Sequence, residues 1–261
     1  MPVTKVNGIN INYSVEGSGE PLVMIIGLGG DQSGWKHQLS VFNKHYKVIT
    51  FDNRGIGMSD KPKGSYSPAI MAEDTIQLMD FLKIEKANIL GVSMGGLIAQ
   101  EIAINYPERI IRLILGCTWS CQDYEANGVT PNMLAATELP PRQGFSRLLD
   151  ASVNKFFNRF VLIPLLKFQF RRMKEPEIAG LMGQADSIKG FDSLDRLPLI
   201  KAPTLILTGT KDRVVKPGSS ETLSRNIPGA KLVKIKNGSH LVCMEMSKAF
   251  NKEVLEFLKS A

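Results

Sequence analysis

The stretch Gly91-Val92-Ser93-Met94-Gly95 decides how this chain folds. It follows a short apolar run at residues 88–92, which predicts a buried strand, and it opens residues 94–105, which predict a helix. A serine flanked by glycines at such a junction is typical of a strained turn that lifts the serine hydroxyl out of the sheet. The two glycines leave space where strand and helix pass closely, so a side chain at either would push the turn open.

Apolar runs of the same kind recur along the chain, separated by stretches of helical pattern. They are too short for helices and rich in Ile, Leu and Val, which suits strands of a parallel sheet buried on both faces. These runs occupy residues 22–26, 47–51, 88–92, 113–115, 204–207 and 231–235. Helices are predicted over residues 68–83, 94–105 and 247–258, and Asn7-Gly8 predicts an antiparallel hairpin between residues 3–6 and 9–15. The alternation predicts an α/β fold with a mostly parallel central sheet flanked by helices.

The alternation stops after Leu115 and resumes near Thr204. The intervening segment is far longer than a normal connection, so it has to fold as an insert. We predict that residues 118–197 form a mostly helical cap, and that residues 1–117 and 198–261 form the core of the protein.

Composition excludes several classes of protein. With 261 residues, 43% hydrophobic and 22% charged, the chain suits a large globular domain and neither a disordered nor a collagen-like protein. No apolar run approaches the length that crosses a bilayer, about 20 residues, and the N-terminus lacks the pattern of a secretory signal. We therefore expect a cytoplasmic protein with no stable membrane insertion. Three cysteines without a CxxC spacing and three histidines favour neither a disulfide framework nor a metal site, so no metal or cofactor is expected.

The net charge of +7 is concentrated in the predicted cap. Between residues 142 and 174 a single acid, Asp150, accompanies the basic residues Arg142, Arg147, Lys155, Arg159, Lys167, Arg171, Arg172 and Lys174. Two interpretations remain open: amphipathic helices with their apolar faces on the core, or an apolar wall whose cations attract an anionic substrate or a membrane surface. No segment resembles a nucleic-acid-binding module, so no nucleic acid partner is expected.

Ser93 needs a general base, and a turn of this kind supplies its partners in the order serine, acid, histidine. Of the three histidines only His240 lies beyond Ser93, in a loop after a predicted strand. Asp212 also follows a predicted strand and lies between the two, so it is the candidate acid that orients the imidazole. Other aspartates rank below it because they lie in the predicted cap, away from any sheet edge: Asp186, Asp192 and Asp195.

A second motif makes the assignment more specific. Phe51-Asp52-Asn53-Arg54-Gly55-Ile56-Gly57-Met58-Ser59 resembles the D-x-R-G-x-G-x-S turn of the α/β-hydrolase superfamily, and the turn at Ser93 and the candidate triad are similar to those of the same family. The resemblance covers nearly all of the chain except the predicted cap and implies the α/β-hydrolase fold. It is closest to the capped branch that contains carboxylesterases, enol-lactonases and carbon–carbon bond hydrolases. In this family the D-x-R-G turn is usually structural, so we expect no catalytic role for it.

The resemblance also implies an oxyanion hole made of two backbone donors. The N–H of Met94, at the start of the helix after Ser93, is one donor, and the N–H of Leu28 is the other. Ile26 departs from the family, which usually has a histidine there that braces the loop. We therefore expect backbone and packing alone to orient the Leu28 N–H.

These residues predict a cofactor-independent serine hydrolase that cleaves a carboxylic ester through an acyl-enzyme. Its partner is expected to be a small-molecule ester or other carbonyl compound, apolar and anionic if the cations of the cap contact it. The serine argues against the dehalogenase and epoxide hydrolase branches, which resemble this fold with aspartate at the turn. Two alternatives remain: a carbon–carbon bond hydrolase or enol-lactonase acting on ring-cleavage products, and a hydrolase-like ligand-binding protein, for which Ile26 is the one argument. The acyl chain length, the leaving group and the oligomeric state stay open.

Overall fold

The computed structural model describes residues 2–64, 66–121, 138–153, 160, 163–164, 167–168 and 172–260. The strands are β1 (Val3–Val6), β2 (Ile9–Glu16), β3 (Pro21–Ile25), β4 (Lys47–Phe51), β5 (Ala87–Val92), β6 (Ile110–Gly116), β7 (Thr204–Gly209) and β8 (Lys231–Ile235). The α-helices are α1 (Lys36–Phe42), α2 (Pro68–Phe81), α3 (Met94–Asn105), α5 (Pro141–Ser152), α7 (Glu175–Ser187), α8 (Pro217–Asn226), α9 (Val242–Glu245) and α10 (Ser247–Lys259). Short 3₁₀ helices are η1 (Gln32–Trp35), η2 (Pro107–Arg109) and η4 (Leu194–Leu199).

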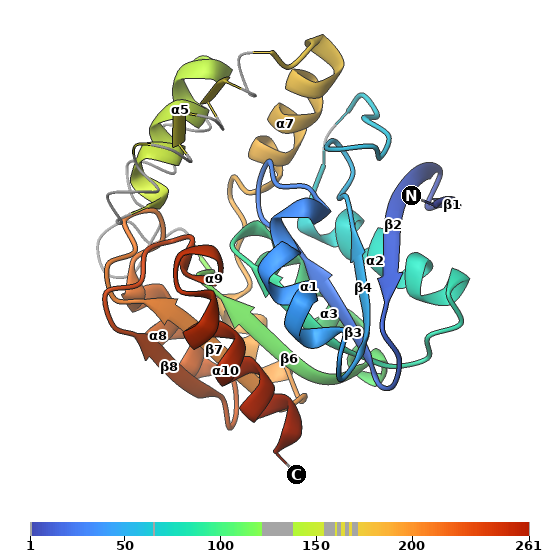
Figure 1. Ribbon diagram of the computed structural model, residues 1–261, viewed down its shortest axis with the longest axis vertical. Helices are drawn as coiled ribbons and strands as arrows, with labels where there is room; N and C mark the ends of the chain where they lie inside the picture. The colour runs from blue at the N-terminus through green and yellow to red at the C-terminus, as the bar shows by residue number, and fades with distance from the viewer. Residues whose placement is uncertain are drawn as a thin grey trace.

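The strands form one sheet of eight in the order β1-β2-β4-β3-β5-β6-β7-β8 (Figure 1). The pairs β1–β2 and β2–β4 are antiparallel and every other pair is parallel, which confirms the predicted α/β fold with a mostly parallel sheet. Asn7 and Gly8, at φ 45° and 79°, make the predicted hairpin turn between β1 and β2. Both have positive φ, as a two-residue turn matched to the twist of the strands requires.

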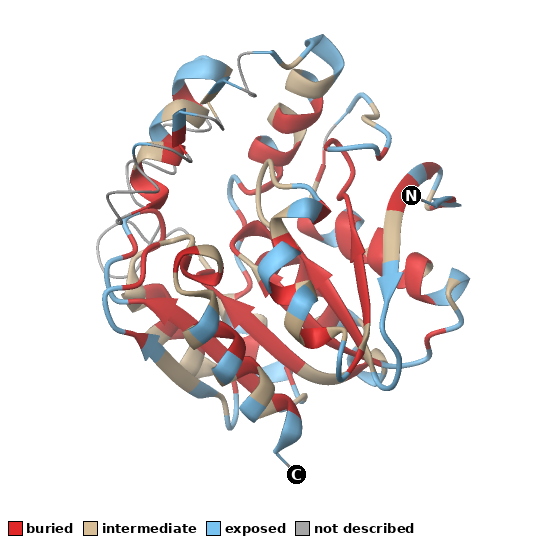
Figure 2. Cartoon of the chain, viewed as in Figure 1, coloured by how far each residue is buried: buried red, intermediate tan, exposed pale blue. Residues whose placement is uncertain are grey.

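Helices cover both faces of the sheet, and two hydrophobic cores result. On one face α1 and α10 bring Phe42, Phe250 and other apolar side chains onto alternate residues of the central strands, such as Met24 and Leu90. On the other face α2, α3 and α8 pack on the residues between them, such as Ile25 and Ile89. The central strands are therefore buried over most of their length, as Figure 2 shows. Burial on both faces explains why these strands read as continuous apolar runs.

Most elements match the predicted ranges, and α8 is the main omission. Its buried residues are Ser219, Ser220, Thr222 and Leu223, so it packs on the sheet with small polar side chains. An apolar repeat at helical spacing is therefore absent from its sequence, and no pattern indicated a helix there. Strand β6 is also longer than predicted, because Arg112 interrupts its apolar run.

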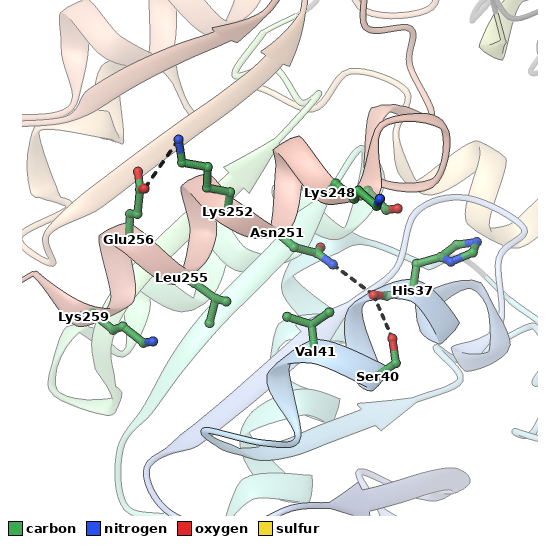
Figure 3. A pocket seen from close by; sticks show the side chains of 10 residues that line it. His37, Ser40, Val41, Lys248, Asn251, Lys252, Leu255, Glu256 and Lys259 are labelled. Atoms are coloured by element: carbon green, nitrogen blue, oxygen red, sulfur yellow. Dashed lines mark hydrogen bonds and ion pairs between the residues drawn. The ribbon is translucent and has the colours of Figure 1, made fainter.

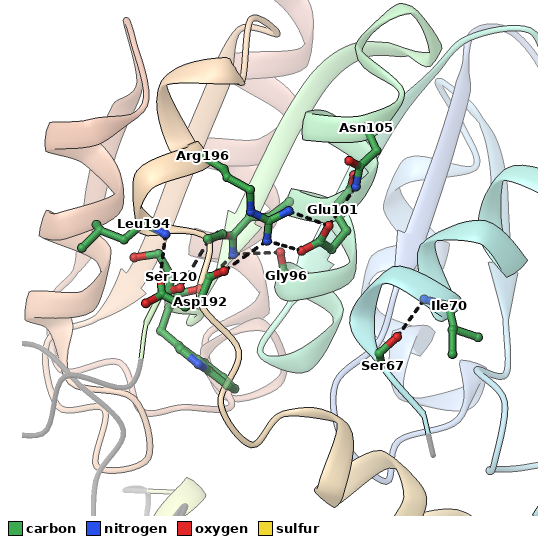
Figure 4. Close-up of polar contacts among 12 residues, drawn as sticks. Ser67, Ile70, Gly96, Glu101, Asn105, Ser120, Asp192, Leu194 and Arg196 are labelled. Atoms are coloured by element: carbon green, nitrogen blue, oxygen red, sulfur yellow. Dashed lines mark hydrogen bonds and ion pairs between the residues drawn. The ribbon is translucent and has the colours of Figure 1, made fainter. Parts of the chain in front are cut away.

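The described part of residues 118–197 contains the helices α5 and α7 and ends in η4. Its two ends meet: the N–H of Ser193 donates to the carbonyl of Ser120 at 2.8 Å. The guanidinium of Arg196 donates to both carboxylate oxygens of Glu101 on α3, at 2.6 and 3.0 Å (Figure 4). The segment thus leaves the core and returns to it beside α3, while its assignment as a separate cap, between core residues 1–117 and 198–261, stays a prediction.

In the part of the chain that the structure describes, no helix is both long enough and apolar enough to cross a membrane.

Candidate active site

Ser93 occupies the tight turn between β5 and α3. Its φ and ψ of 55° and −123° are strained for a residue with a side chain, and the surrounding glycines make the turn possible. A Cβ at Gly91 would lie 2.2 Å from the carbonyl oxygen of Gly95, and one at Gly95 would lie 2.1 Å from the carbonyl oxygen of Ile25. Both contacts are with backbone, which cannot move aside. The expected role of the two glycines therefore has a direct steric basis.

The imidazole of His240 lies between Ser93 and Asp212. Its Nε2 is 3.0 Å from the Ser93 Oγ, and its Nδ1 is 2.8 Å from Oδ2 of Asp212. The other carboxylate oxygen of Asp212 accepts from the N–H groups of Val214 and Val215, at 2.8 and 2.9 Å. With both oxygens bonded and the side chain fully buried, the carboxylate has one orientation, and that orientation points at the imidazole. The three candidates that the sequence spread over almost 150 positions thus lie within hydrogen-bond reach of one another.

The loops that carry the acid and the histidine are bonded to each other. The N–H of Lys211 donates to the carbonyl of Gly238 at 2.8 Å, where the loops after β7 and β8 cross. Ser239, next to His240, donates through a short hydrogen bond to the buried carboxylate of Glu245 on α9. Sequence reasoning missed Glu245, and only its spacing of six residues from Ser239 could have indicated it. These contacts hold the loop that carries His240 against the loop that carries Asp212.

The three aspartates that ranked below Asp212 serve elsewhere or lie apart from His240. Asp186 pairs with Lys189 at 2.7 Å on the C-terminal turn of α7. Asp192 accepts from the N–H of Leu194, the first residue of η4, at 2.8 Å. Asp195 lies in the first turn of the same helix.

The loop that follows β3 passes directly beside Ser93. A Cβ on Gly27 would lie 3.0 Å from the Ser93 Cβ and 3.5 Å from its Oγ. Among the residues that the structure describes, neither the N–H of Leu28 nor that of Met94 has a hydrogen-bond partner. Within the described part of the chain, the two N–H groups predicted to form the oxyanion hole are therefore unpaired, one at the start of α3 and one in the loop that meets Ser93.

The expectation that backbone and packing alone orient this loop is wrong. The side-chain amide of Asn53 donates to the carbonyl of Ile26 at 3.0 Å, and the side-chain oxygen of Gln184 accepts from the N–H of Gly29 at 3.0 Å. Ile26 itself packs over Gly30 and Gly34, where a Cβ would meet its side chain at 2.8 and 2.5 Å. Sequence reasoning missed both amides, because Asn53 lies in a turn of structural type and Gln184 is more than 150 residues away from the loop.

The D-x-R-G turn has the bonding of a structural element. The carboxylate of Asp52 accepts from Asn12, from the N–H of Gln32 and from the N–H of Met58, all at 2.8–2.9 Å. The guanidinium of Arg54 pairs with the buried carboxylate of Asp74 through two hydrogen bonds of 2.5 and 2.6 Å. Burial raises the pKa of Asp74, and the Arg54 charge opposes that shift.

Cys117, at the end of β6, brings a third metal-binding side chain close to the pair. Its Sγ lies within 4.8 Å of donor atoms of Asp212 and His240. Burial first, and then the nearby Asp212 carboxylate, raises the pKa of the Cys117 thiol well above its usual range, so the thiol keeps its proton. A metal ion here would need the thiolate and would have to break the bond between Asp212 and His240. The group fits a packed acid–histidine pair better than a metal site.

A separate groove of about 600 Å³ lies between α1 and α10, and no residue of the Ser93 site lines it (Figure 3). Asn251 crosses its floor and donates to the carbonyl of His37 at 2.9 Å. Lys248, Lys252 and Lys259 line the α10 side.

The sequence model of the alpha/beta hydrolase fold family matches residues 20–246 of this chain. A Mycobacterium tuberculosis protein with the provisional name non-heme bromoperoxidase BpoC is 31% identical, over 97% of this chain and 98% of its own length. The 3-oxoadipate enol-lactonase 2 of Acinetobacter baylyi is 27% identical, over 96% and 94%. The crystal structure of the enol-lactonase from Burkholderia xenovorans LB400 superposes with a TM-score of 0.87 at 28% identity, covering 99% of this chain and 100% of that one.

The chain therefore belongs to the α/β-hydrolase fold family, as the motifs at Ser93 and Asp52 predicted. It is an enzyme of the α/β-hydrolase class, and a small molecule is the substrate that such a fold implies.

Proposed function

We propose that this protein is a serine hydrolase that cleaves carboxylic esters without a cofactor. The observation that carries the proposal is the position of His240, 3.0 Å from the Ser93 hydroxyl and 2.8 Å from the Asp212 carboxylate. That constellation is the working geometry of nucleophilic acyl transfer.

In the proposed reaction His240 takes the proton of Ser93 as its Oγ attacks the ester carbonyl. Asp212, hydrogen-bonded to Nδ1, holds the imidazole in the tautomer that leaves Nε2 free to accept, and stabilises the imidazolium that forms. The N–H groups of Leu28 and Met94 donate to the oxyanion. His240 then protonates the leaving alcohol, and the acyl group remains on Ser93. A water molecule, deprotonated by His240, hydrolyses the acyl-enzyme by the same steps in reverse.

Turnover of p-nitrophenyl esters from acetate to decanoate tests the proposal. We expect a burst of p-nitrophenol followed by steady turnover in the wild-type protein, because acylation releases the phenol before water attacks. In Ser93→Ala the burst disappears and kcat falls by about 10³ to 10⁶, since only the oxyanion hole and binding remain. A variant that keeps its burst would contradict Ser93 as the nucleophile.

An enol-lactonase is the second candidate, supported by the enol-lactonases of 27% and 28% identity that align over nearly the whole chain. A lactone is a cyclic ester, so the same residues would open it by the same steps. Measuring kcat/KM under the same conditions for an enol-lactone and for a linear ester of similar size separates the two candidates. A lactonase has the higher kcat/KM for the lactone.

We also propose that the substrate is anionic and is attracted by the basic residues between 142 and 174. Three of these basic residues lie outside the part of the chain that the structure describes: Lys155, Arg159 and Arg171. Of the described basic residues, Lys167 pairs with Asp150 at 2.6 Å and Arg172 lies over the ring of Phe168 at 5.5 Å. If the cations attract the substrate, kcat/KM falls with salt for an anionic ester and stays constant for a neutral one. Equal salt responses would refute this part.

A further inference from the structure

Helix α7 lies against the loop that carries the Leu28 N–H. One face of the helix makes the contacts with the core, through Gly180, Leu181 and Gln184, and we call these residues the seam. Gly180 touches the turn after β4: a Cβ on it would lie 2.1 Å from the carbonyl oxygen of Gly55. One helical turn further along the same face, Gln184 is fully buried and carries an amide between two loops of the core. Its oxygen accepts from the N–H of Gly29 at 3.0 Å, and its nitrogen donates to the carbonyl of Arg54 at 2.9 Å.

The four residues of the loop, Gly27 to Gly30, form a β-turn whose type is defined by backbone angles. The N–H of Gly30 donates to the carbonyl of Gly27 at 3.2 Å, and Gly29 has φ +71° while Leu28 does not have positive φ. These are the marks of a type II turn, which differs from type I by rotation of its central peptide. The N–H of that central peptide is the one on Gly29. Gln184 therefore accepts the hydrogen bond that distinguishes the two forms of the turn.

The same turn orients the Leu28 N–H. This N–H belongs to the same peptide unit as the Gly27 carbonyl, and the two point in opposite directions because the peptide is planar. The hydrogen bond from Gly30 to this carbonyl sets the direction of the donor, and the Gln184 bond to the next peptide keeps the turn that contains it in the type II form. Phe145 on α5 and Leu181 on α7 close over Gly29, where a Cβ would meet them at 2.8 and 3.0 Å. The turn is held from the inserted segment and from the core together.

From these contacts we infer that Gln184 is a positioning residue that holds the oxyanion loop in its donating form, in place of the histidine that the family has at Ile26. The inference rests on the proposed function for its catalytic consequence, and on the bond to Gly29 for its structural part. It assigns to the segment 118–197 a role in transition-state stabilisation.

The deciding variant is Gln184→Met, which keeps the length of the side chain and removes both hydrogen bonds. Because a misplaced oxyanion donor acts on the transition state, we expect kcat for a p-nitrophenyl ester to fall by about tenfold to a hundredfold while KM changes by less than about threefold. The Ki of a trifluoromethyl ketone, which forms a tetrahedral oxyanion on Ser93, should rise by the same factor as kcat/KM falls.

Asn88→Leu is the matched control. Asn88 is also a fully buried amide that donates to a backbone carbonyl, that of Pro21 at 3.2 Å, but it lies at the opposite end of β5 from Ser93. The Asn88→Leu variant should be less stable than the wild type but have the same kcat. Equal losses of kcat in the two variants, or a loss confined to KM in Gln184→Met, would overturn the inference.

Gln184→Glu provides a rescue. A neutral carboxylic acid accepts from the Gly29 N–H and donates to the Arg54 carbonyl as the amide does, whereas a carboxylate repels that carbonyl. We expect the ratio of variant to wild-type kcat/KM to be highest at acid pH and to fall as pH rises. A ratio that is constant with pH would contradict the bridging role.

Amide hydrogen exchange separates failure of the inference from failure of the proposed function. If the wild-type protein shows no hydrolysis that depends on Ser93, the proposed ester hydrolase is wrong, and the exchange of the Gly29 N–H still tests the structural claim. This exchange should be at least about tenfold faster in Gln184→Met and unchanged in Asn88→Leu, because the bond protects the amide. Unchanged exchange in Gln184→Met overturns the inference whatever the activity.

Discussion

At the scale of single residues, the site depends on groups whose hydrogen bonds leave them one orientation. The Asp212 carboxylate is the clearest case, since two backbone N–H groups hold one oxygen and His240 takes the other. Val214 and Val215, which supply those N–H groups, are themselves fully buried. The acid is thus positioned by the turn that follows it in sequence.

Asp212→Asn tests whether the carboxylate sets the tautomer of His240. The amide can donate to Nδ1 and so favour the tautomer with the proton on Nε2, which cannot accept the Ser93 proton. We expect kcat to fall by about 10⁴ at neutral pH with little change in the melting temperature. Stopped-flow measurement of the acylation burst checks this, and a burst at the wild-type rate would contradict it.

At the scale of elements, glycine contacts determine how α7 meets the core. Gly180 lies against the carbonyl of Gly55, which is backbone, whereas a Cβ on Gly183 would meet the ring of Tyr66 at 2.8 Å. A ring can rotate or shift, and a backbone carbonyl in a bonded turn cannot. The two glycines on one helix face therefore tolerate substitution differently.

We expect Gly180→Ala to lower the free energy of unfolding by about 1–3 kcal/mol, because the overlap outweighs the gain in helix propensity. Gly183→Ala is the matched variant and should cost less. Urea unfolding of both variants measures the difference. Since α7 carries Gln184, Gly180→Ala should also reduce kcat, and equal stability of the two variants would count against the seam.

At the scale of the whole molecule, the segment between β6 and β7 is bonded to every loop that carries the site. On the α5 side the carbonyl of Ser152 accepts from the N–H of Leu241, and the guanidinium of Arg213 donates to the carbonyl of Asp150 at 3.0 Å. On the α7 side Gln184 reaches the loops after β3 and β4. The loops that carry Asp212, His240 and Leu28 are therefore each adjacent to a hydrogen bond from this segment.

Global stability should fall at alkaline pH because of the buried thiols. Burial raises the pKa of Cys243 from 9.0 to about 12, so the folded protein keeps a proton that the unfolded chain releases between these values. Unfolding then releases a proton, and stability is full below pH 9 and declines as pH rises toward 12. At about 1.4 kcal/mol per pH unit, this residue accounts for at most about 4 kcal/mol.

Urea unfolding of the wild type and of Cys243→Ala between pH 8 and 11 measures how much of the alkaline loss of stability comes from Cys243. The variant should be less stable at pH 8 because a small cavity remains, but its stability should decline less steeply with pH than that of the wild type. Parallel curves of stability against pH would contradict the assignment of the decline to Cys243.

The three thiols should also differ in reactivity. Since Cys117 and Cys243 are buried and Cys121 is partly exposed, a thiol reagent should label Cys121 first.

The sequence by itself determined the order of the strands along the chain and indicated the residues that we propose for the active site. Apolar runs that are buried on both faces can be recognised without any contact information. The turn at Ser93 carries glycines because a Cβ on either would lie within 2.2 Å of a backbone oxygen. Asp212 and His240 were predictable because parallel strands bring their carboxyl ends to one edge of the sheet. Helix α8, which buries small polar residues, left no such pattern.

The tertiary structure alone decided what braces the oxyanion loop. The sequence indicated only that a histidine was missing at Ile26, and it suggested that packing replaced it. The bond from Gln184 to Gly29 joins residues 155 positions apart, and a side-chain amide on a helix has no local signal for the distant backbone group that it meets. Local patterns encode the strands, helices and turns, whereas a hydrogen bond between an inserted segment and the core exists only once the two are packed together.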